Sequence, residues 1–197
     1  MAETPALRLA QNLSADALLS RDPFALLTGM LLDQQIPMEK AFSGPYVLAE
    51  RLGDPARLDP VAVAAYPPEA FAALMAGPPA VHRCPGSLAG RVQALAKVIV
   101  DSYAGHCETL WTTATTGPEL LRRLVELPGF GEQKARIFVA LLGKQCGVRP
   151  RGWRTAAGSY GEHGSRRSVA DVRDPGTLAE VRAYKRELKQ AAKVAPG

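Results

Sequence analysis

The chain has little cysteine and no long apolar run, and both shortages restrict the kinds of protein that it can be. Its three cysteines, Cys84, Cys107 and Cys146, are odd in number and far apart. This spacing argues against a disulfide framework and against a zinc site with paired thiolates, so we expect reduced thiols that are buried or half-buried. No apolar segment approaches the roughly twenty residues of a membrane-spanning helix, and no basic segment followed by an apolar one opens the chain. We therefore expect a cytoplasmic protein that makes no membrane contact.

The sequence also lacks convincing alternation of apolar and polar residues, which is the pattern of a half-buried strand. Apolar residues recur instead at helical spacing, between segments rich in proline and glycine. We predict an all-α fold in a single domain over residues 1–197. Asp22 before Pro23 is a typical helix start, and Ser87 and Thr177 are predicted to cap in the same way. The predicted helices are 22–34, 38–52, 69–75, 87–104, 118–126, 132–146 and 177–194, and residues 147–168 are predicted to be irregular.

Positive charge is concentrated in the last quarter of the chain. The net charge is +5, yet residues 149–197 contain eleven Lys or Arg against five Asp or Glu, whereas residues 1–148 contain thirteen against fourteen. A basic extension of this kind is suited to a phosphate backbone, and Arg151 and Arg154 are expected to contact DNA. For the lysines and arginines of 185–193, a solvated helical face is an equally good interpretation.

The most informative segment is Leu-Pro-Gly-Phe-Gly-Glu-Gln-Lys-Ala, residues 127–135. Apolar residues at helical spacing precede and follow it, which predicts two helices that meet at a tight turn within residues 120–146. Pro128 ends the first helix, while Gly129 and Gly131 can adopt positive φ and leave backbone N–H groups uncovered. Such groups, at the positive end of a helix dipole, suit a phosphate oxygen. The alternative is an ordinary helical corner whose glycines only allow close packing.

Two basic residues, Lys134 and Arg136, follow this turn. The string Leu-Pro-Gly-Phe-Gly-x-x-x-Ala, with the basic residues beside it, resembles the helix-hairpin-helix of the base-excision DNA glycosylases, the HhH-GPD family. The resemblance covers residues 20–155 and implies two helical lobes with a DNA-binding cleft. It implies that the N–H groups of the hairpin hold a DNA phosphate, and that Lys134 and Arg136 contact DNA. The hairpin residues concerned are Gly129, Phe130 and Gly131.

The resemblance also bears on cofactors. In the family the hairpin carbonyls often hold a monovalent cation, which here would be a Na⁺ or K⁺ at the carbonyl oxygens of Val125, Leu127 and Phe130. Many members carry a four-cysteine iron–sulfur loop after the catalytic domain, but no cysteine follows Cys146 in this chain. We therefore expect no iron–sulfur cluster, and no cofactor beyond the hairpin cation.

The chain departs from the family pattern at two catalytic positions. Members place an aspartate in a Gly/Pro-rich loop downstream of the hairpin. The matching window here, residues 148–154, has no acidic residue, and the position that matches the aspartate falls at or beside Trp153. Members with lyase activity form a Schiff base through a lysine two residues after the second hairpin glycine, and that position is Gln133 here. Lys134 comes one residue later, about 100° around the helix, and is expected to face elsewhere. A monofunctional glycosylase with an atypical acid and no lyase activity is therefore implied.

A second resemblance lies in Leu31-Leu32-Asp33-Gln34-Gln35-Ile36, which is similar to the family segment where a helix ends in a Gln-containing turn. In relatives this turn faces the minor groove and fills the gap left by a flipped base. The resemblance implies that Gln34, Gln35 and Ile36 contact DNA, with Gln35 or Ile36 as the plug. Asp33 stands where relatives commonly have a small neutral residue, and it is our first candidate for the catalytic carboxylate. The alternative for Asp33 is an exposed helix residue, or one that is bonded to a neighbouring turn.

Other residues are candidates for the same chemistry. Asp171 and Glu39 are alternative catalytic carboxylates, although Asp171 with Ser168 also fits a variant of the capping box. Trp153 and Tyr160 are expected to stack on an extruded base. For Trp153, a place in the core is an equally good interpretation.

These patterns favour a base-excision DNA repair glycosylase, a monomer that acts on double-stranded DNA and is associated with the nucleoid. One alternative is a catalytically inactive helix-hairpin-helix DNA-binding protein, and another is a scaffold for partner proteins. The hypotheses differ in what they predict for the structure. An enzyme should bring a buried carboxylate, Trp153 or Tyr160, and the Gln35 turn to one pocket, whereas a DNA-binding protein should have that pocket filled.

Overall fold

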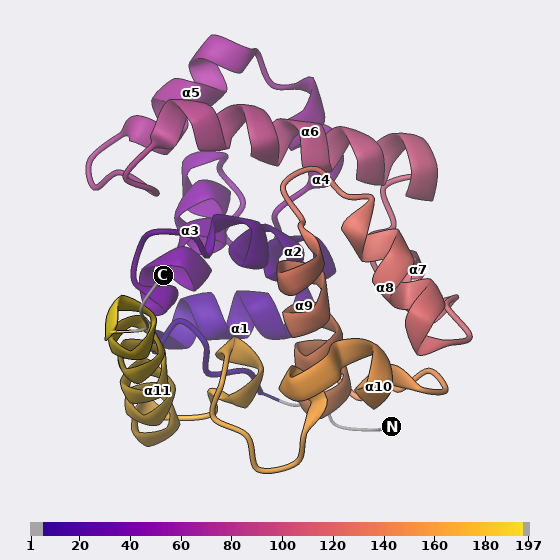
Figure 1. Cartoon of the computed structure of the whole chain (residues 1–197). Coiled ribbons are helices and arrows are strands. Elements are labelled where there is room, and N and C mark those ends of the chain that lie inside the picture. The colour runs from indigo at the N-terminus through magenta and orange to yellow at the C-terminus, as the bar shows by residue number, and fades with distance from the viewer. Residues whose placement is uncertain (1–5, 195–197) are drawn as a thin grey trace.

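Helices make up the regular structure of the chain, which is described by a computed structural model over residues 6–194 (Figure 1). Within those residues, extended pairing is limited to an isolated bridge between Thr116 and Arg151. The predicted all-α fold is confirmed. The elements are α1 (Leu13–Arg21), α2 (Pro23–Leu32), α3 (Met38–Arg51), α4 (Pro60–Ala65), α5 (Pro68–Ala76), α6 (Pro85–Tyr103), α7 (Thr109–Thr112), α8 (Gly117–Val125), α9 (Glu132–Gln145), α10 (Trp153–Ala157), the 3₁₀ turns η1 (Gly158–Gly161) and η2 (Val169–Asp171), and α11 (Pro175–Val194).

The seven predicted helices are confirmed with ends within two residues of the prediction, whereas two of the three predicted caps are wrong. Asp22 does cap α2, because its Oδ1 accepts the N–H of Ala25 at 3.0 Å. Helix α6 begins at Pro85, ahead of Ser87, and has no side-chain cap. At α11 the cap is Asp174, whose Oδ1 accepts the N–H of Thr177 at 2.7 Å. Pro85 and Pro175 start these helices two residues early because their fixed φ already suits the first helical position.

Several short elements were not predicted. Residues 147–168, predicted to be irregular, contain α10 and η1. Helix α1 was missed because it is only nine residues long, although Ala15, Leu18 and Leu19 are buried. Short helices of this kind depend on tertiary packing, since their local pattern is too brief to nucleate a helix alone.

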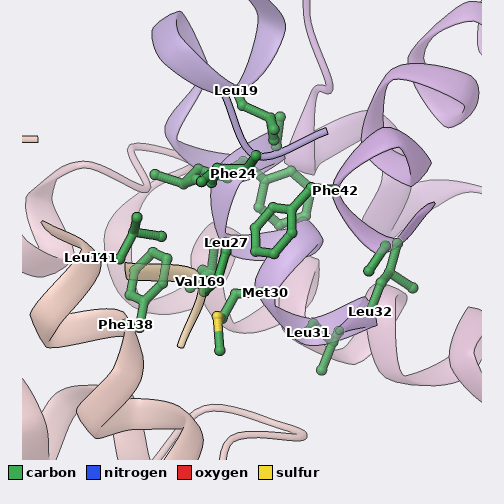
Figure 2. Packing of buried hydrophobic residues seen from close by; sticks show 14 of the residues in the cluster. Leu19, Phe24, Leu27, Met30, Leu31, Leu32, Phe42, Phe138, Leu141 and Val169 are labelled. Carbon is green, nitrogen blue, oxygen red and sulfur yellow. The ribbon is translucent and has the colours of Figure 1, made fainter. Parts of the chain in front are cut away.

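The centre of the core is helix α2, in which every residue from Phe24 to Leu32 is buried. It crosses α3 closely, because a Cβ on Gly29 would lie 2.7 Å from Cδ1 of Phe42. Figure 2 shows Leu27 of α2 between Phe42 of α3 and Phe138 of α9. The dense packing fixes where α2 ends, and the turn after α2 is the start of the candidate site.

Around this centre, α6 lies across one side of the molecule beside α4 and α5, while α8 and α10 pack against α9 (Figure 1). Helix α11 lies at the flank, near the ends of α3 and α2. Its buried residues are Leu178 and Val181, so most of its surface faces outward. No helix within residues 6–194 combines the length and apolar character needed to cross a membrane.

Candidate functional site

A cavity of about 820 Å³ opens where α2 ends and α9 begins. Its walls come from five regions that are distant in sequence: the end of α2 with the α2–α3 turn, the segment before α6, the first turn and a half of α9, η1 with the loop after it, and α11. The volume is within the range of small-molecule sites. The lining residues are Met30, Asp33, Gln34, Gln35, Ile36, Pro37, Arg83, Gln133, Lys134, Ile137, Ser159, Tyr160, Arg167, Tyr184, Lys185, Leu188 and Lys189.

Asp33 lies at the C-cap of α2, where its N–H donates to the carbonyl of Gly29 at 3.1 Å. Its side chain is half-buried, and no residue in the described range donates a hydrogen bond to its carboxylate. Burial raises the pKa of Asp33 above its ordinary value, and Glu39 raises it further, while the positive charges of Lys185 and Lys134 oppose the shift. The cavity therefore contains a desolvated carboxylate with free acceptor positions.

The turn after Asp33 is held from behind by a buried histidine. Nδ1 of His82 accepts the N–H of Cys84 at 3.0 Å, which leaves the proton on Nε2 to donate to the carbonyl of Gln34 at 2.9 Å. Gln35 follows with φ of +58°, a left-handed conformation that costs a non-glycine residue about 1 kcal/mol. Because the backbone is fixed in this way, the exposed side chain of Gln35 projects at the edge of the cavity.

The turn between α8 and α9 presents backbone rather than side chains. Gly129 has φ of +79°, and a Cβ there would lie 2.3 Å from Cδ1 of Leu31, so only glycine fits. Gly131 is the N-cap of α9 and provides no side-chain cap, and the space around its Cα is open. The ring of Phe130 is buried and lies edge-on to Phe138 with 6.1 Å between centroids. Any contact of Phe130 with a ligand would therefore use its backbone.

The expectation that Lys134 faces away from the site is wrong. Its Nζ crosses to the last turn of α2 and donates to the carbonyl of Leu31 at 2.9 Å, one of the helix-end carbonyls that lack a partner within the helix. Burial lowers the pKa of Lys134 to about 8, the charge of Arg91 contributes to the lowering, and Asp33 opposes it. Its neighbour Gln133 also lines the cavity and donates from Nε2 to the hydroxyl of Tyr160 at 2.9 Å.

Several predicted site residues lie elsewhere. Trp153 is 8% exposed and packs its ring against Gly143, so the structure places it in the core and not in the cavity wall. Of the two aromatic candidates, only Tyr160 lines the cavity. Arg136 pairs with Glu132 and donates to the carbonyl of Ala156. Neither Arg151 nor Arg154 lines the cavity.

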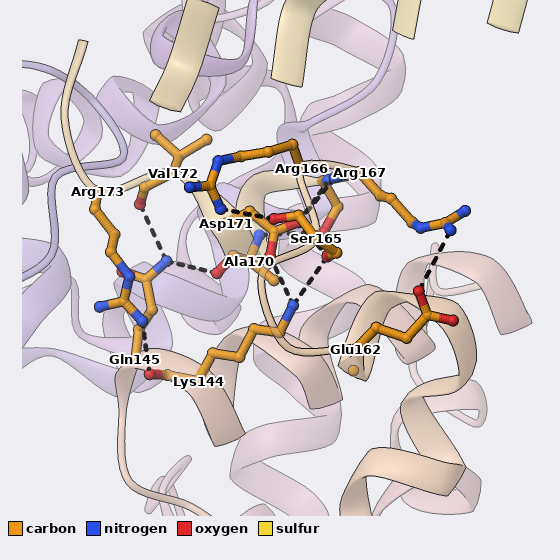
Figure 3. Close-up of polar contacts among 12 residues, drawn as sticks. Lys144, Gln145, Glu162, Ser165, Arg166, Arg167, Ala170, Asp171, Val172 and Arg173 are labelled. Carbon is orange, nitrogen blue, oxygen red and sulfur yellow. Dashed lines mark hydrogen bonds and ion pairs between the residues drawn. The ribbon is translucent and has the colours of Figure 1, made fainter. Parts of the chain in front are cut away.

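The alternative carboxylates are engaged by other partners, as Figure 3 shows for Asp171. Oδ1 of Asp171 accepts from Nζ of Lys144 at 2.6 Å, and Oδ2 accepts from the hydroxyl of Ser165 at 2.9 Å and the N–H of Arg167 at 2.8 Å. The predicted capping box with Ser168 is present. Glu39 forms an ion pair with Arg182 of α11. Neither carboxylate lines the large cavity.

Sequence reasoning missed most of the cationic wall. Five lysine or arginine side chains line the cavity against the single carboxylate of Asp33, and Lys134 is the one of these five that was predicted as a site residue. Arg83 and Arg167 were not predicted as site residues, and Lys185 and Lys189 were assigned to the basic extension, for which a solvated helical face was an equally good interpretation. The spacing of Tyr184, Lys185, Leu188 and Lys189 places them on one helical face, and this was the available signal, although nothing local showed which surface that face would meet.

Other chemistries are weakly represented. Within the described residues, no group of three or more His, Cys, Asp or Glu side chains is placed to hold a metal ion. The three cysteines are free, and Cys84 is exposed, contrary to the expectation that all three are at least half-buried. Neither a family model nor a curated protein matches this chain. Inference about function therefore depends on the cavity and its neighbours.

Proposed function

We propose that the protein is a monofunctional base-excision DNA glycosylase, which hydrolyses the N-glycosidic bond of a damaged or modified base flipped out of duplex DNA. One observation carries the proposal: Asp33, Tyr160 and the Gln35 turn converge on one open cavity, although they come from distant segments. This is the arrangement expected of an enzyme, since a protein that only binds DNA has no use for an open pocket with a desolvated carboxylate.

The chemistry assigned to Asp33 is general-base catalysis at the sugar. Hydrolysis adds water across the bond between C1′ and the base: the water oxygen bonds to C1′, and the base leaves with the electron pair of the broken bond. The Asp33 carboxylate accepts the proton of the attacking water, and its negative charge stabilises the oxocarbenium-like sugar. Its raised pKa brings it closer to neutral pH, where a general base is most effective.

The surroundings of Asp33 suit a polyanionic substrate. Arg83, Lys134 and Lys189 are among the cations of the cavity wall, and such charges attract and position phosphates. By the resemblance, Gln35 or Ile36 would fill the gap that the flipped base leaves in the duplex. The resemblance also assigns a phosphate to the uncovered N–H groups at the start of α9, where Gly131 leaves the approach open.

The rest of the resemblance belongs to the same proposal. The helices on the two sides of the cavity would form two lobes around a DNA cleft, with α8 and α9 as the helix-hairpin-helix. Val125 ends α8, and the last carbonyl oxygens of a helix have no partner within it. Neutral oxygens of this kind, with those of Leu127 and Phe130, suit a Na⁺ or K⁺ that would support the hairpin. We propose a monomer that acts on double-stranded DNA in the nucleoid.

A second candidate activity, strand cleavage through an imine, is favoured by the position of Lys134. Its amine lines the cavity beside Asp33, and its pKa of about 8 gives a usable neutral fraction at physiological pH. Borohydride reduction during incubation with an abasic duplex separates the two activities. A covalent protein–DNA adduct that is lost in Lys134→Met would replace the monofunctional assignment, whereas base release without an adduct would support it.

The proposal is tested with duplexes that carry uracil, alkylated, oxidised or deaminated bases. Released base is measured for the wild type and for Asp33→Asn, which keeps the shape of the side chain but cannot accept a proton as a carboxylate does. We expect release from at least one substrate and a loss of about 100-fold or more in the variant. Duplex binding without release from any substrate would identify the protein as a DNA-binding protein without glycosylase chemistry.

A further inference from the structure

A second cavity, of about 390 Å³, lies at the opposite end of α9 from the first. The loops before α10 and around η2 enclose it. Residues that are adjacent in the sequence line the two cavities, since Arg167 lines the large one and Arg166 lines the small one. The small cavity is rich in cations and holds a single carboxylate. Its lining residues are Lys144, Arg149, Arg154, His163, Gly164, Ser165, Arg166, Ala170, Asp171 and Arg173.

Three of these cations have no acidic partner. Lys144 is paired with Asp171, and Arg166 is paired with Glu180. Within the described residues, by contrast, the guanidinium groups of Arg149, Arg154 and Arg173 make no salt bridge and donate to backbone carbonyls. The cavity therefore has three positive charges that nothing in its wall neutralises.

The carbonyl bonds also orient these guanidinium groups. Nε of Arg149 donates to the carbonyl of Gly143 at 2.9 Å, and Nη2 of Arg173 donates to the carbonyl of Lys144 at 3.1 Å. Arg154 is held by the carbonyl of Gly161 at 2.6 Å and stacks on Trp153, with Cζ 4.5 Å from the ring centroid. Each guanidinium group uses one of its N–H donors to bond a neutral carbonyl oxygen, so its other N–H donors are available to an anion.

We propose that this second cavity binds an oligophosphate. Three oriented guanidinium groups match several phosphate oxygens at once, because planar forks bind phosphate in a bidentate manner. Successive phosphates of a nucleic-acid backbone and the phosphates of a free nucleotide share this chemistry. The inference does not depend on base excision, since the ligand contacts neither Asp33 nor the large cavity.

Pyrophosphate is the probe, and calorimetric titration is the measurement. We expect wild-type protein to bind it, and the double variant Arg149→Gln/Arg173→Gln to bind at least 10-fold more weakly. The control is Arg122→Gln/Lys97→Gln, which removes the same charge from exposed surface pairs on α8 and α6. Its affinity should stay within 2-fold of wild type. No binding by wild type, or equal losses in both double variants, would overturn the proposal.

A second measurement uses wild-type protein only, so a poorly folded variant cannot obscure the result. Modification of arginines by phenylglyoxal is followed by mass spectrometry with and without pyrophosphate. Protection of Arg149, Arg154 and Arg173, with Arg122 still modified, supports the site. Protection spread evenly over all arginines contradicts it.

The source of the phosphates is decided with the same variants. If Arg149→Gln/Arg173→Gln weakens binding of an undamaged duplex as well as pyrophosphate, the site holds a nucleic-acid backbone. If duplex affinity is unchanged and binding of a nucleoside triphosphate is lost, the ligand is a free nucleotide. Pyrophosphate binding without any base release would keep this inference and remove the proposed glycosylase activity, so the two failures are distinguishable.

Discussion

Both ends of α9 bring a lysine close to an aspartate, but the two pairs differ in how completely they are bonded. At the C-terminal end, Lys144 and Asp171 are in direct contact at 2.6 Å, and the carboxylate also accepts from Ser165 and two backbone N–H groups. At the N-terminal end, Lys134 donates to a carbonyl instead, and the carboxylate of Asp33 accepts no hydrogen bond within the described range.

The difference separates a pair with a structural role from a pair that we propose to be reactive. A buried carboxylate whose acceptor positions are all used holds the chain together and has nothing left to offer a ligand. A desolvated carboxylate with free positions is costly for folding, and proteins keep such groups mainly where chemistry needs them. Changes at either end of α9, or in the packing along it, test this contrast.

The largest effect on stability is expected at the bonded end. Asp171→Asn removes the charge opposite Lys144, whose side chain is only 9% exposed, and so leaves an uncompensated ammonium group in a buried position. We expect unfolding free energy to fall by about 3 kcal/mol, measured by urea denaturation. Asp33→Asn in the same assay should be neutral or stabilising. Equal destabilisation by both variants would remove the contrast.

A slightly smaller loss is expected where α9 packs on α10. A Cβ on Gly143 would lie 2.3 Å from the ring of Trp153, so Gly143→Ala forces the ring to move at a cost of about 2 kcal/mol. The control is Gly90→Ala in the middle of α6, where the added Cβ meets nothing within 4 Å. There the better helix former should slightly raise the melting temperature. An unchanged Gly143→Ala would show that Trp153 is not a fixed core residue.

The sequence could predict those elements whose signals are local. Asp22–Pro23 and the dense apolar run after it identify α2, and two apolar runs around the Gly-Phe-Gly turn identify α8 and α9. Asp33 was a candidate through the resemblance of residues 31–36 to a Gln-containing turn of the glycosylase family, which is also a local pattern. Helix ends were less accurate because a proline at the first position and a preceding cap compete for the boundary.

Long-range pairing could not be predicted. Trp153 had two equally good interpretations, and the choice depended on Gly143, whose missing side chain makes room for the ring. The fate of Asp171 depended on Lys144, 27 residues away. Lys185 reaches the cavity only because α11 docks at the flank of α2 and α3, and a solvated basic helix has the same sequence pattern.

The N-terminal end can be tested without changing the fold. Gly131 has φ of −84° and open space around it, so Gly131→Ala is tolerated by the backbone. If the N–H groups at the start of α9 hold a phosphate, the added methyl group obstructs it, and duplex affinity should fall about 10-fold, or about 1.4 kcal/mol. Fluorescence anisotropy with a labelled duplex is the measurement. Unchanged affinity, with Gly90→Ala as the matched control, would exclude the hairpin as a phosphate site.

The smallest expected effect comes from pH. An amine with a pKa of about 8, such as Lys134, is mostly charged at pH 7 and mostly neutral at pH 9. Duplex affinity should therefore fall a few-fold between these values, since one positive charge in the cavity wall is lost. In Lys134→Met the same interval should show a flat response. A wild-type response as flat as that of the variant would mean that the charge of Lys134 does not contact or attract DNA.

The central claim, that Asp33 is the reactive carboxylate and Asp171 the structural one, is tested most directly by single-turnover base release. The rate is measured for wild type, Asp33→Asn and Asp171→Asn on one substrate, at a temperature where all three are folded. The proposed role of each residue predicts a loss of about 100-fold or more for Asp33→Asn and a rate within a few-fold of wild type for Asp171→Asn. A full rate in Asp33→Asn, or a greater loss in Asp171→Asn, would contradict it.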